Sequence, residues 1–281
     1  MFVNWYSLSR VLPTTVEIDG YIEQKLDLLV GVGLYATKSE AVRDAIRHLI
    51  QEVDLVSIAV ELYSKGRVSL GFCAEVAELS TEELLVVLQR KGVRPSLGLE
   101  EMSQLEAEVG VVSATDSLLV EGSCLGIVTD SLGYSLLEGA HWRLLVAQAQ
   151  LDELSFDLRR KILSRMGDPN SPFTLVTGAK GVEEFAAENS ISHGEAASIL
   201  SAIKAKAVLV ADDQKVRTVA TNSGLRVVST PALIVYALGR GALTEDAALS
   251  SFEKLFSRGY YLPLSPTELS TKKLSVKILK G

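Results

Sequence analysis

Two neighbouring stretches decide the fold of this chain: Ser192-His193-Gly194-Glu195-Ala196-Ala197, and Ala207-Val208-Leu209-Val210-Ala211-Asp212-Asp213-Gln214-Lys215-Val216-Arg217. From the first stretch onward, small and apolar residues recur at helical spacing, which predicts a helix with one packed face. The second begins as an apolar run without polar alternation, which is typical of a strand buried on both faces of a parallel sheet. Asp212 and Asp213 follow where that strand ends.

These two aspartates lie where a ligand is expected. In an open parallel α/β sheet, ligands bind outside the carboxyl ends of the strands. Carboxylates gathered there repel one another unless a positive group joins them, and a divalent cation with oxygen ligands is the usual solution. We therefore expect Asp212 and Asp213 to contribute to a metal site. The alternative is that they only cap helices.

The same residues resemble the PIN domain family of metal-dependent nucleases. The similarity is to a branch with a Gly-Glu-Ala-x-x-Ile helix, here Gly194–Ile199, followed by a strand ending in Asp-Asp. It continues through Gly224–Val228, Thr230–Leu233 and Gly259–Leu262. The resemblance implies an α/β fold with a PIN-like doubly wound parallel sheet over residues 108–281, preceded by small, mainly helical modules.

Composition sets the outer limits. A chain of 281 residues fits about two domains, and 47% hydrophobic residues with a mean hydropathy of +0.24 supply a buried core. A net charge of −7 is not that of a protein that coats nucleic acid, although it permits a local basic face.

Features that would mark an extracellular or membrane protein are missing from the sequence. Cys73 and Cys124 form no Cys-x-x-Cys pair, which favours buried, reduced thiols. No apolar run approaches the ~18 residues that span a membrane. Residues 1–6 do not resemble a signal peptide. We expect a cytoplasmic protein without a membrane partner.

Residues 1–52 resemble the ribbon-helix-helix fold, which in that family pairs two chains on operator DNA. Thr14–Asp19 alternates like a half-buried strand, a helix follows, and Thr37 with Glu40 predicts a capping box for a second helix. The motif that carries the resemblance is Ser39–Arg47. It implies a homodimer with phosphate at the start of the second helix, and the residues concerned are Thr37, Ser39 and Arg43. Glu17 on the outward face of the ribbon leaves dimerisation without DNA binding as an open alternative.

Residues 53–98 resemble a small helix-turn-helix-like family that often occurs as an antitoxin. A helix over Leu55–Tyr63 is followed by a turn and by a second helix capped at Ser80. Lys and Arg residues flank these helices. They either approach phosphate or are ordinary solvent-exposed residues at the helix ends. Pro95–Gly98 is predicted to be the linker into the next domain.

The first carboxylate of the PIN-like site should follow the first strand, and there are two candidates. Asp116 follows the apolar run Val111–Ser113, and Asp130 ends a similar run. We prefer Asp116, because residues 118–137 then form the helical crossover that parallel strands require. If Ala114 instead holds the family's first acidic position, the site has lost a ligand.

The remaining site residues are implied by the resemblance. Glu153 follows a predicted strand at Arg143–Ala147 and matches the family's second acidic residue. Mg²⁺ or Mn²⁺ would be the cofactor, activating water against an RNA phosphodiester. Lys215 and Arg217 would approach RNA phosphate, unless they only solvate their helix. The predicted catalytic and metal-binding residues are Asp116, Glu153, Glu195, Asp212 and Asp213.

Our main hypothesis is a PIN-type, metal-dependent endoribonuclease behind its own antitoxin-like modules, in effect a toxin–antitoxin-like fusion. The alternative is a catalytically impaired, dimeric DNA-binding transcriptional regulator. A nucleotide-binding switch is a weaker third class, because the sequence has no glycine-rich phosphate loop.

Overall fold

The computed structural model of this protein describes residues 17–131, 142–166, 171 and 173–263, without the side chains at positions 127, 130 and 131. The chain divides between Asp54 and Leu55 into two compact units. Within the described ranges, no helix is long and apolar enough to cross a membrane.

The first unit consists of two helices, α1 (Gly20–Gly31) and α2 (Lys38–Glu52). Asp19 caps α1, and the Thr37 side chain caps α2 by accepting from the Glu40 nitrogen at 3.1 Å, as predicted. Positions 17–19 of the predicted ribbon strand have no regular structure, and the rest of that strand lies outside the described residues. The ribbon therefore stays a prediction.

Three further helices open the second unit: α3 (Leu55–Ser64), α4 (Leu70–Val76) and α5 (Thr81–Arg90). Ser69 caps α4, accepting from the Phe72 nitrogen at 3.0 Å. Ser80 and Glu83 form a reciprocal capping box at the start of α5, which confirms the predicted helix start.

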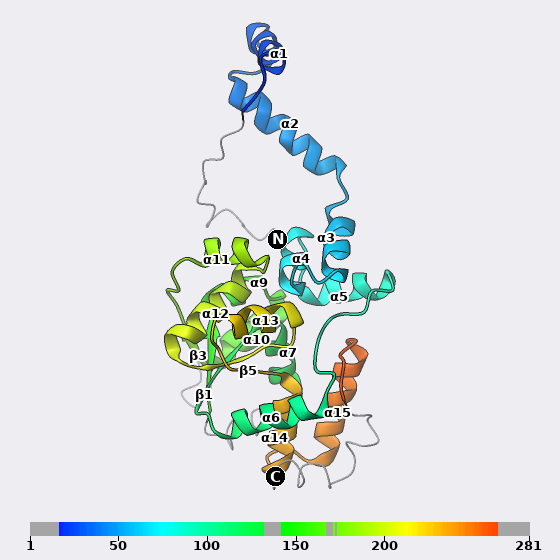
Figure 1. The fold of residues 1–281 in the computed structure, drawn as a ribbon, viewed down its shortest axis with the longest axis vertical. Helices are drawn as coiled ribbons and strands as arrows, with labels where there is room; N and C mark the ends of the chain where they lie inside the picture. The colour runs from blue at the N-terminus through cyan, green and yellow to red at the C-terminus, as the bar shows by residue number, and fades with distance from the viewer. Residues whose placement is uncertain (1–16, 132–141, 167–170, 172, 264–281) are drawn as a thin grey trace. The chain divides into compact units, whose positions relative to one another are not determined.

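The second unit is built on a five-stranded parallel sheet with the strand order β3-β2-β1-β4-β5 (Figure 1). The prediction of an α/β fold with a parallel sheet preceded by helical modules is confirmed. Neighbouring strands pair in register, for example Leu118 with Leu144 and Leu119 with Leu209. The strands are β1 (Ser117–Val120), β2 (Arg143–Ala147), β3 (Phe173–Val176), β4 (Val208–Val210) and β5 (Val227–Val228).

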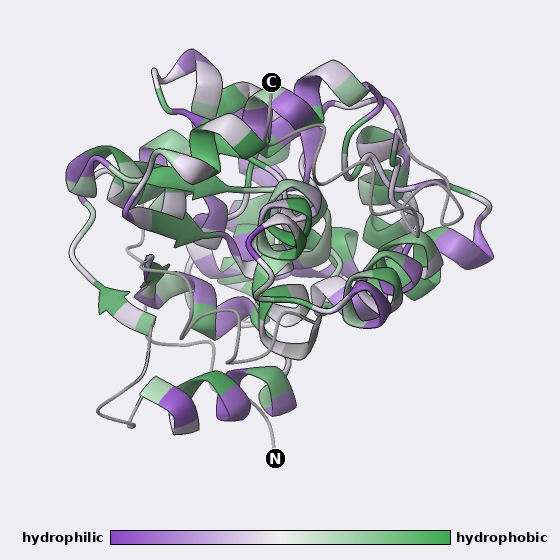
Figure 2. Ribbon diagram, turned by 90° about the horizontal axis from the view of Figure 1, so that it is seen from below, coloured by the Kyte–Doolittle hydropathy of each residue, from purple (hydrophilic) through white to green (hydrophobic). Residues whose placement is uncertain are grey.

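Helices cover both faces of this sheet, because alternate strand residues enter two separate apolar clusters. Leu118 and Val120 face one cluster and Leu119 the other, and the strands are drawn largely in the hydrophobic colour in Figure 2. The first face is packed by α6 (Met102–Ser113), α7 (Gly122–Ser131), α9 (Gln148–Glu153), α10 (Phe156–Met166), α14 (Thr230–Gly239) and α15 (Glu245–Ser257). The second face is packed by α11 (Val182–Asn189), α12 (His193–Ala205) and α13 (Gln214–Asn222).

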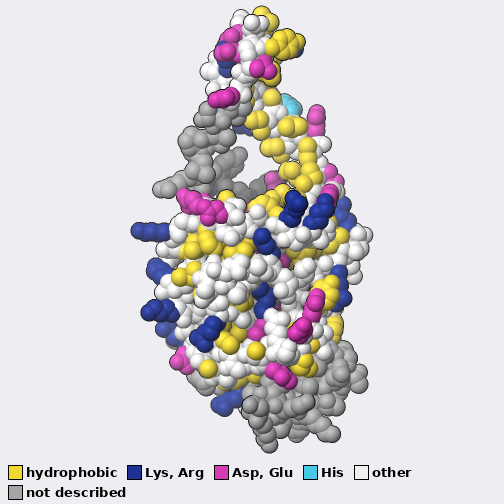
Figure 3. All heavy atoms as spheres, viewed as in Figure 1, with side chains coloured by type: hydrophobic (Ala, Val, Ile, Leu, Met, Phe, Trp, Pro, Cys, Tyr) yellow, Lys and Arg dark blue, Asp and Glu magenta, His cyan; other side chains and the backbone are white. Residues whose placement is uncertain are grey.

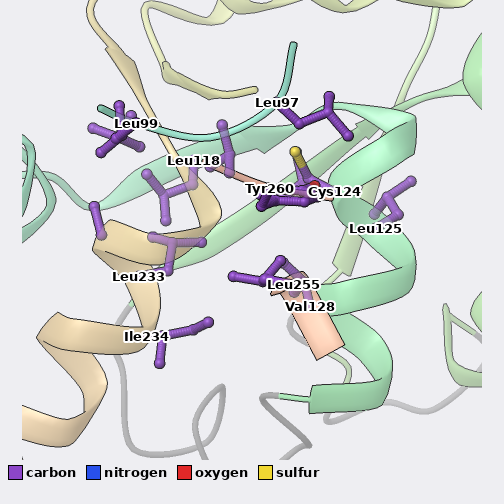
Figure 4. Close-up of a cluster of buried hydrophobic side chains, with 14 of the residues drawn as sticks. Leu97, Leu99, Leu118, Cys124, Leu125, Val128, Leu233, Ile234, Leu255 and Tyr260 are labelled. Carbon is purple, nitrogen blue, oxygen red and sulfur yellow. The ribbon is translucent and has the colours of Figure 1, made fainter. Parts of the chain in front are cut away.

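The predicted linker at Pro95–Gly98 is not a free connection. Leu97 and Leu99 are 1% and 0% exposed, and both belong to the larger apolar cluster (Figure 4). Leu97 also bridges to Asp213, and Gly98 to Tyr261. Helices α3 to α5 and the sheet therefore share one core.

The prediction of a strand at Val111–Ser113 is wrong. These residues end helix α6, because Leu105, Val109 and Val112 recur at helical spacing and are buried together against α14. The first strand begins after Asp116 rather than before it. A short apolar run cannot by itself distinguish a buried strand from a buried helix turn.

A buried ion pair fastens α13 to α6. Arg217 donates from Nη2 to Oε1 of Glu108, and from Nη1 to the Ala211 carbonyl at 2.8 Å. The other oxygen of Glu108 accepts from the nitrogen and the hydroxyl of Ser229, at 2.8 and 2.6 Å. Arg217 is thus a structural residue whose two terminal nitrogens both donate to partners inside the fold.

Replacing Arg217 with Ala should lower the free energy of unfolding by about 3–5 kcal/mol, because Glu108 is left as an uncompensated buried charge. Chemical denaturation of the whole chain measures this. Exposed Arg226 is the matched control, and its change to Ala should stay within about 0.5 kcal/mol. Equal effects from the two substitutions would contradict the structural role of Arg217.

Candidate metal centre

Five carboxylates gather at the carboxyl edge of the sheet, and we call them the acidic cluster. Glu121 follows β1, and Asp212 and Asp213 follow β4. In the sheet, β1 has β2 as its neighbour on one side and β4 on the other, so the strand order reverses direction at β1. Such a reversal is the topological switch point where α/β sheets bind ligands. Glu195 at the start of α12 and Glu153 at the end of α9 complete the cluster.

Glu121 is held inside the fold by α7 and α9. Its two oxygens accept from the Ser123 nitrogen at 3.1 Å each, and one also accepts from the Ser123 hydroxyl. The Gln150 side-chain nitrogen donates to it at 3.2 Å, while Oε1 of Gln150 has no hydrogen-bond partner. Among the residues that the structure describes, the donors to Glu121 are all neutral.

Asp212 is fixed from within the core. Its Oδ1 accepts from the Thr230 nitrogen at 2.8 Å, and its Oδ2 accepts from the Tyr260 hydroxyl at 2.9 Å and the Cys124 thiol at 3.2 Å. Figure 4 shows Cys124 and Tyr260 side by side among the apolar residues of this region. Because the side chain is fully buried with both oxygens engaged, Asp212 has a supporting position.

Asp213 and Glu195 both combine a capping role with a place in the cluster. Oδ1 of Asp213 caps α13 through the nitrogens of Lys215 and Val216, at 2.8 and 3.1 Å. Glu195 forms a capping box with Ser192, whose nitrogen donates to Oε2 at 2.7 Å. The capping alternative is therefore realised, and it coexists with clustering.

Glu153 approaches the same point through a close contact with α12. It accepts from the Gly194 nitrogen and from the Ser192 hydroxyl, the latter at 2.9 Å. A side chain at position 194 would collide with this carboxylate, so the glycine of the Gly-Glu-Ala motif is what admits Glu153. Ser192 thereby links Glu153 to Glu195.

Burial dominates the electrostatics of the cluster. Removal from water raises the pKa of Glu121 to about 7, of Asp213 to about 6 and of Glu153 to about 8. The pKa of Glu195 also lies well above its usual value, because of burial and then of the charges on Asp213 and Glu121. In the described part of the chain, no Lys or Arg forms an ion pair with these carboxylates.

The donor chemistry of the cluster fits a hard divalent cation, since it consists of carboxylate oxygens that lack a cationic partner. The arrangement of these side chains in the structure, however, is not that of a formed metal site. Among the described residues, no three Asp, Glu, His or Cys side chains converge as metal ligands do, and the oxygens of the acidic cluster accept hydrogen bonds. An ion would have to replace some of those donors.

Asp116 was predicted as the first carboxylate, and that placement is wrong. It is exposed and precedes β1, so it lies at the opposite end of the strand from the acidic cluster. Ala114 ends helix α6 and has no bearing on the site, which removes the suspected loss of a ligand. Asp130 lies in α7, and its side chain is outside the described residues.

The structure affects the two predicted RNA phosphate contacts, Lys215 and Arg217, differently. Arg217 is buried in its ion pair with Glu108, so its predicted approach to RNA phosphate is wrong. Lys215 is half-buried beside Asp213, and its charge offsets a small part of the rise in pKa that burial causes in that aspartate. Basic side chains are distributed over the visible face in Figure 3 instead of forming one stripe.

The remaining predicted contacts lie in the first unit. The Thr37 hydroxyl caps α2, while Arg43 is exposed and donates from Nε to the Ser39 carbonyl at 3.2 Å. Contact of Thr37, Ser39 and Arg43 with DNA phosphate stays a prediction.

Sequence reasoning missed Glu121, Gln150, Cys124 and Tyr260. Glu121 had a usable signal, because Leu118–Val120 is an apolar run that ends in an acidic residue, as Val208–Val210 does. The other three had none, since they reach the cluster from α9, α7 and the segment after α15, and only the tertiary packing reveals this.

Comparison with known proteins identifies two segments. A family model for the PIN domain, DUF3368, matches residues 135–274, and a model for the uncharacterised protein family UPF0175 matches residues 42–108. The chain carries a PIN domain behind a UPF0175 segment. Glu153, Glu195, Asp212 and Asp213 lie within the PIN match, while Glu121 precedes it.

A curated relative covers a short part of the chain. A UPF0175 protein of Archaeoglobus fulgidus is 43% identical over 58 residues, which is 21% of this chain and 66% of the relative. No solved structure gave a significant match.

With divalent metal chelated, the protein should lose stability as the pH rises from about 5 to 8. Carboxyl groups titrate near 4.3 when unfolded but near 6 to 8 in the acidic cluster, so the folded state holds more protons in this window. Glu121→Gln should reduce the loss of unfolding free energy between pH 5 and 8 by about 1–3 kcal/mol, measured by denaturation at several pH values. Exposed Asp116→Asn is the control, and stability that rises over this window would contradict the expectation.

Proposed function

We propose that this protein is a metal-dependent endoribonuclease of the PIN type, fused behind its own antitoxin-like module, and that its substrate is RNA. One observation carries the proposal: buried carboxylates without a cationic partner among the described residues meet at the switch point of a PIN fold. The match of residues 135–274 to the PIN family supports the nuclease class.

The residues that would hold Mg²⁺ or Mn²⁺ are Glu121, Glu153, Glu195 and Asp213. When bound, such an ion activates water and stabilises charge on the phosphate. Asp213 is favoured over Asp212, because its Oδ2 accepts from the Leu70 nitrogen of α4, whereas Asp212 is held by Thr230, Tyr260 and Cys124. Asp212 then acts by positioning the neighbouring Asp213 and by adding negative charge.

The first unit supports a homodimer within this proposal. Ala41 is the one buried residue among its described positions, while α2 exposes Ile46, Leu49 and Ile50 on one stripe. Two helices cannot bury such a face by themselves, and in the ribbon-helix-helix resemblance a second copy covers it. The UPF0175 match begins at residue 42, inside this helix.

A dimeric DNA-binding regulator is the second candidate, and it can coexist with the first. The observation in its favour is that α2 begins in solvent, with a Thr37 cap and an exposed Arg43 one turn later, as a phosphate contact of operator DNA requires. A cytoplasmic location is part of both candidates, since Cys73 and Cys124 are free, buried thiols.

Cleavage of a single-stranded RNA oligonucleotide tests the nuclease. Cleavage should appear with Mn²⁺, vanish with chelator and fall by at least about 100-fold in Asp213→Asn and in Glu121→Gln, because each change removes a metal-binding charge. Asp116→Asn is the matched control and should cleave like the unmodified chain. Cleavage that survives chelation, or that is lost in the control, would count against the proposed site.

Size-exclusion chromatography with light scattering tests the dimer. Leu49→Lys in the full chain places a charge in the apolar stripe of α2 and should weaken dimerisation by at least about tenfold. Gln51→Lys adds the same charge on another face of α2 and should leave the dimer intact. A 30.3 kDa monomer for the unmodified chain would refute the dimer.

A further inference from the structure

The start of helix α4 contacts the acidic cluster directly. The Leu70 nitrogen donates to Oδ2 of Asp213 and the Gly71 nitrogen to Oε1 of Glu195, each at 3.1 Å. The Ser69 hydroxyl donates to Oε2 of Glu195. Three successive residues of one segment thus occupy oxygens of two carboxylates that we assign to the metal.

Flanking contacts seat α4 in this position. The Ser69 nitrogen donates to the Ser190 carbonyl at 3.2 Å, just before α12 begins. At the other end of α4, Glu75 pairs with His193, with 3.1 Å between Oε1 and Nδ1. Helix α4 therefore lies across the start of α12, the element that carries Glu195.

Close approach at Gly71 depends on the missing side chain. A Cβ atom there would lie 2.6 Å from Oε1 of Glu195 and 2.9 Å from Oγ of Ser192, both too close. The residue is not in the left-handed region, and alanine is the better helix former. Glycine at this position is explained by the contact with Glu195 and not by the needs of the helix.

We propose that α4 is a built-in inhibitor of the acidic cluster, and that it must leave before the metal ion and the RNA can bind. This inference rests on the proposed nuclease function. The donors, Ser69 to Gly71, lie in the segment matched by UPF0175, and the acceptors Glu195 and Asp213 lie in the PIN domain.

The mechanism is competition for the same oxygens. With α4 in place, Glu195 and Asp213 are each 2% exposed and lone pairs of both carboxylates are occupied by its donors, so the binding of α4 and the binding of a cation oppose each other. Apolar burial of Leu70, Cys73 and Ala74 holds the closed state. The apparent affinity for metal is then the intrinsic affinity reduced by the open fraction.

Mn²⁺ titration of the full chain, followed by calorimetry, tests this competition without an activity assay. Ser69→Ala removes one donor to Glu195 and the cap of α4, and Gly71→Ala forces α4 away from Glu195. Each should tighten Mn²⁺ binding by about tenfold, the effect of one lost hydrogen bond to a charged group. RNA cleavage at low Mn²⁺ should increase in parallel.

Two control variants match these changes outside the contact. Ser80→Ala removes the cap of α5 in the same module, and Gly110→Ala adds a methyl group to open space on α6. Neither should change Mn²⁺ affinity. Hydrogen exchange supplies a second measurement, in which Mn²⁺ should accelerate exchange of the α4 amides in the unmodified chain.

The outcomes separate the two proposals. If the unmodified chain binds Mn²⁺ and cleaves RNA, but Ser69→Ala and Gly71→Ala do not bind Mn²⁺ more tightly, the inhibitor is overturned and the nuclease stands. Tighter Mn²⁺ binding without RNA cleavage in any form supports the competition and rejects the nuclease. Absence of Mn²⁺ binding in every form overturns both. Where the two variants disagree, exchange of the α4 amides decides.

Discussion

Burial of several like charges at one edge of a parallel sheet is the constraint on which the second unit depends. Glu121, Asp212 and Asp213 are almost completely removed from water, and Glu195 joins them from α12. Placing an isolated carboxylate in such a site is costly unless it is paired or hydrogen-bonded. The surrounding elements supply that stabilisation with N–H and O–H donors, and the described residues supply no ion pair for it.

Those donors come from two directions, and the difference separates support from function. Asp212 is satisfied from the core side by Thr230, Tyr260 and Cys124, which belong to the same packed interior as the sheet. Asp213 and Glu195 are satisfied on their other side by α4. The donors to Asp212 lie on elements of the sheet domain, whereas α4 belongs to the helical segment before it and can leave the cluster only if Leu70, Cys73 and Ala74 also leave the shared core.

Much of this arrangement was readable in the sequence. The Gly-Glu-Ala helix and the Asp-Asp strand end predicted the parallel sheet, and the strand at Arg143–Ala147 was placed correctly. The first strand was misplaced because Val111–Ser113 and Leu118–Val120 are both short apolar runs. Only packing against α14 shows that the first is helical.

Only the part of the site that depends on local motifs was predicted, because contacts between distant residues leave no local pattern. Glu153 and Glu195 followed from local motifs, and the structure brings both into the cluster. Arg217 illustrates the limit, since its partner Glu108 lies 109 positions earlier on α6. No local pattern reveals a contact at that separation. The contact of Ser69 with Glu195 spans 126 positions, so the role of α4 could not be anticipated.

The neutral chemistry of α4 bears on how such a contact could be regulated. A basic side chain inserted among buried carboxylates would form a charge-assisted bond that a metal ion displaces only at great cost. Backbone N–H groups and a serine hydroxyl satisfy the same oxygens without cancelling their charge, so the attraction for a cation persists in the closed state. Because α4 belongs to the same chain, its local concentration is high and a few weak bonds suffice to keep it in place. A weak, tethered and uncharged cap is therefore suited to a site that has to stay closed and yet remain responsive to a divalent ion.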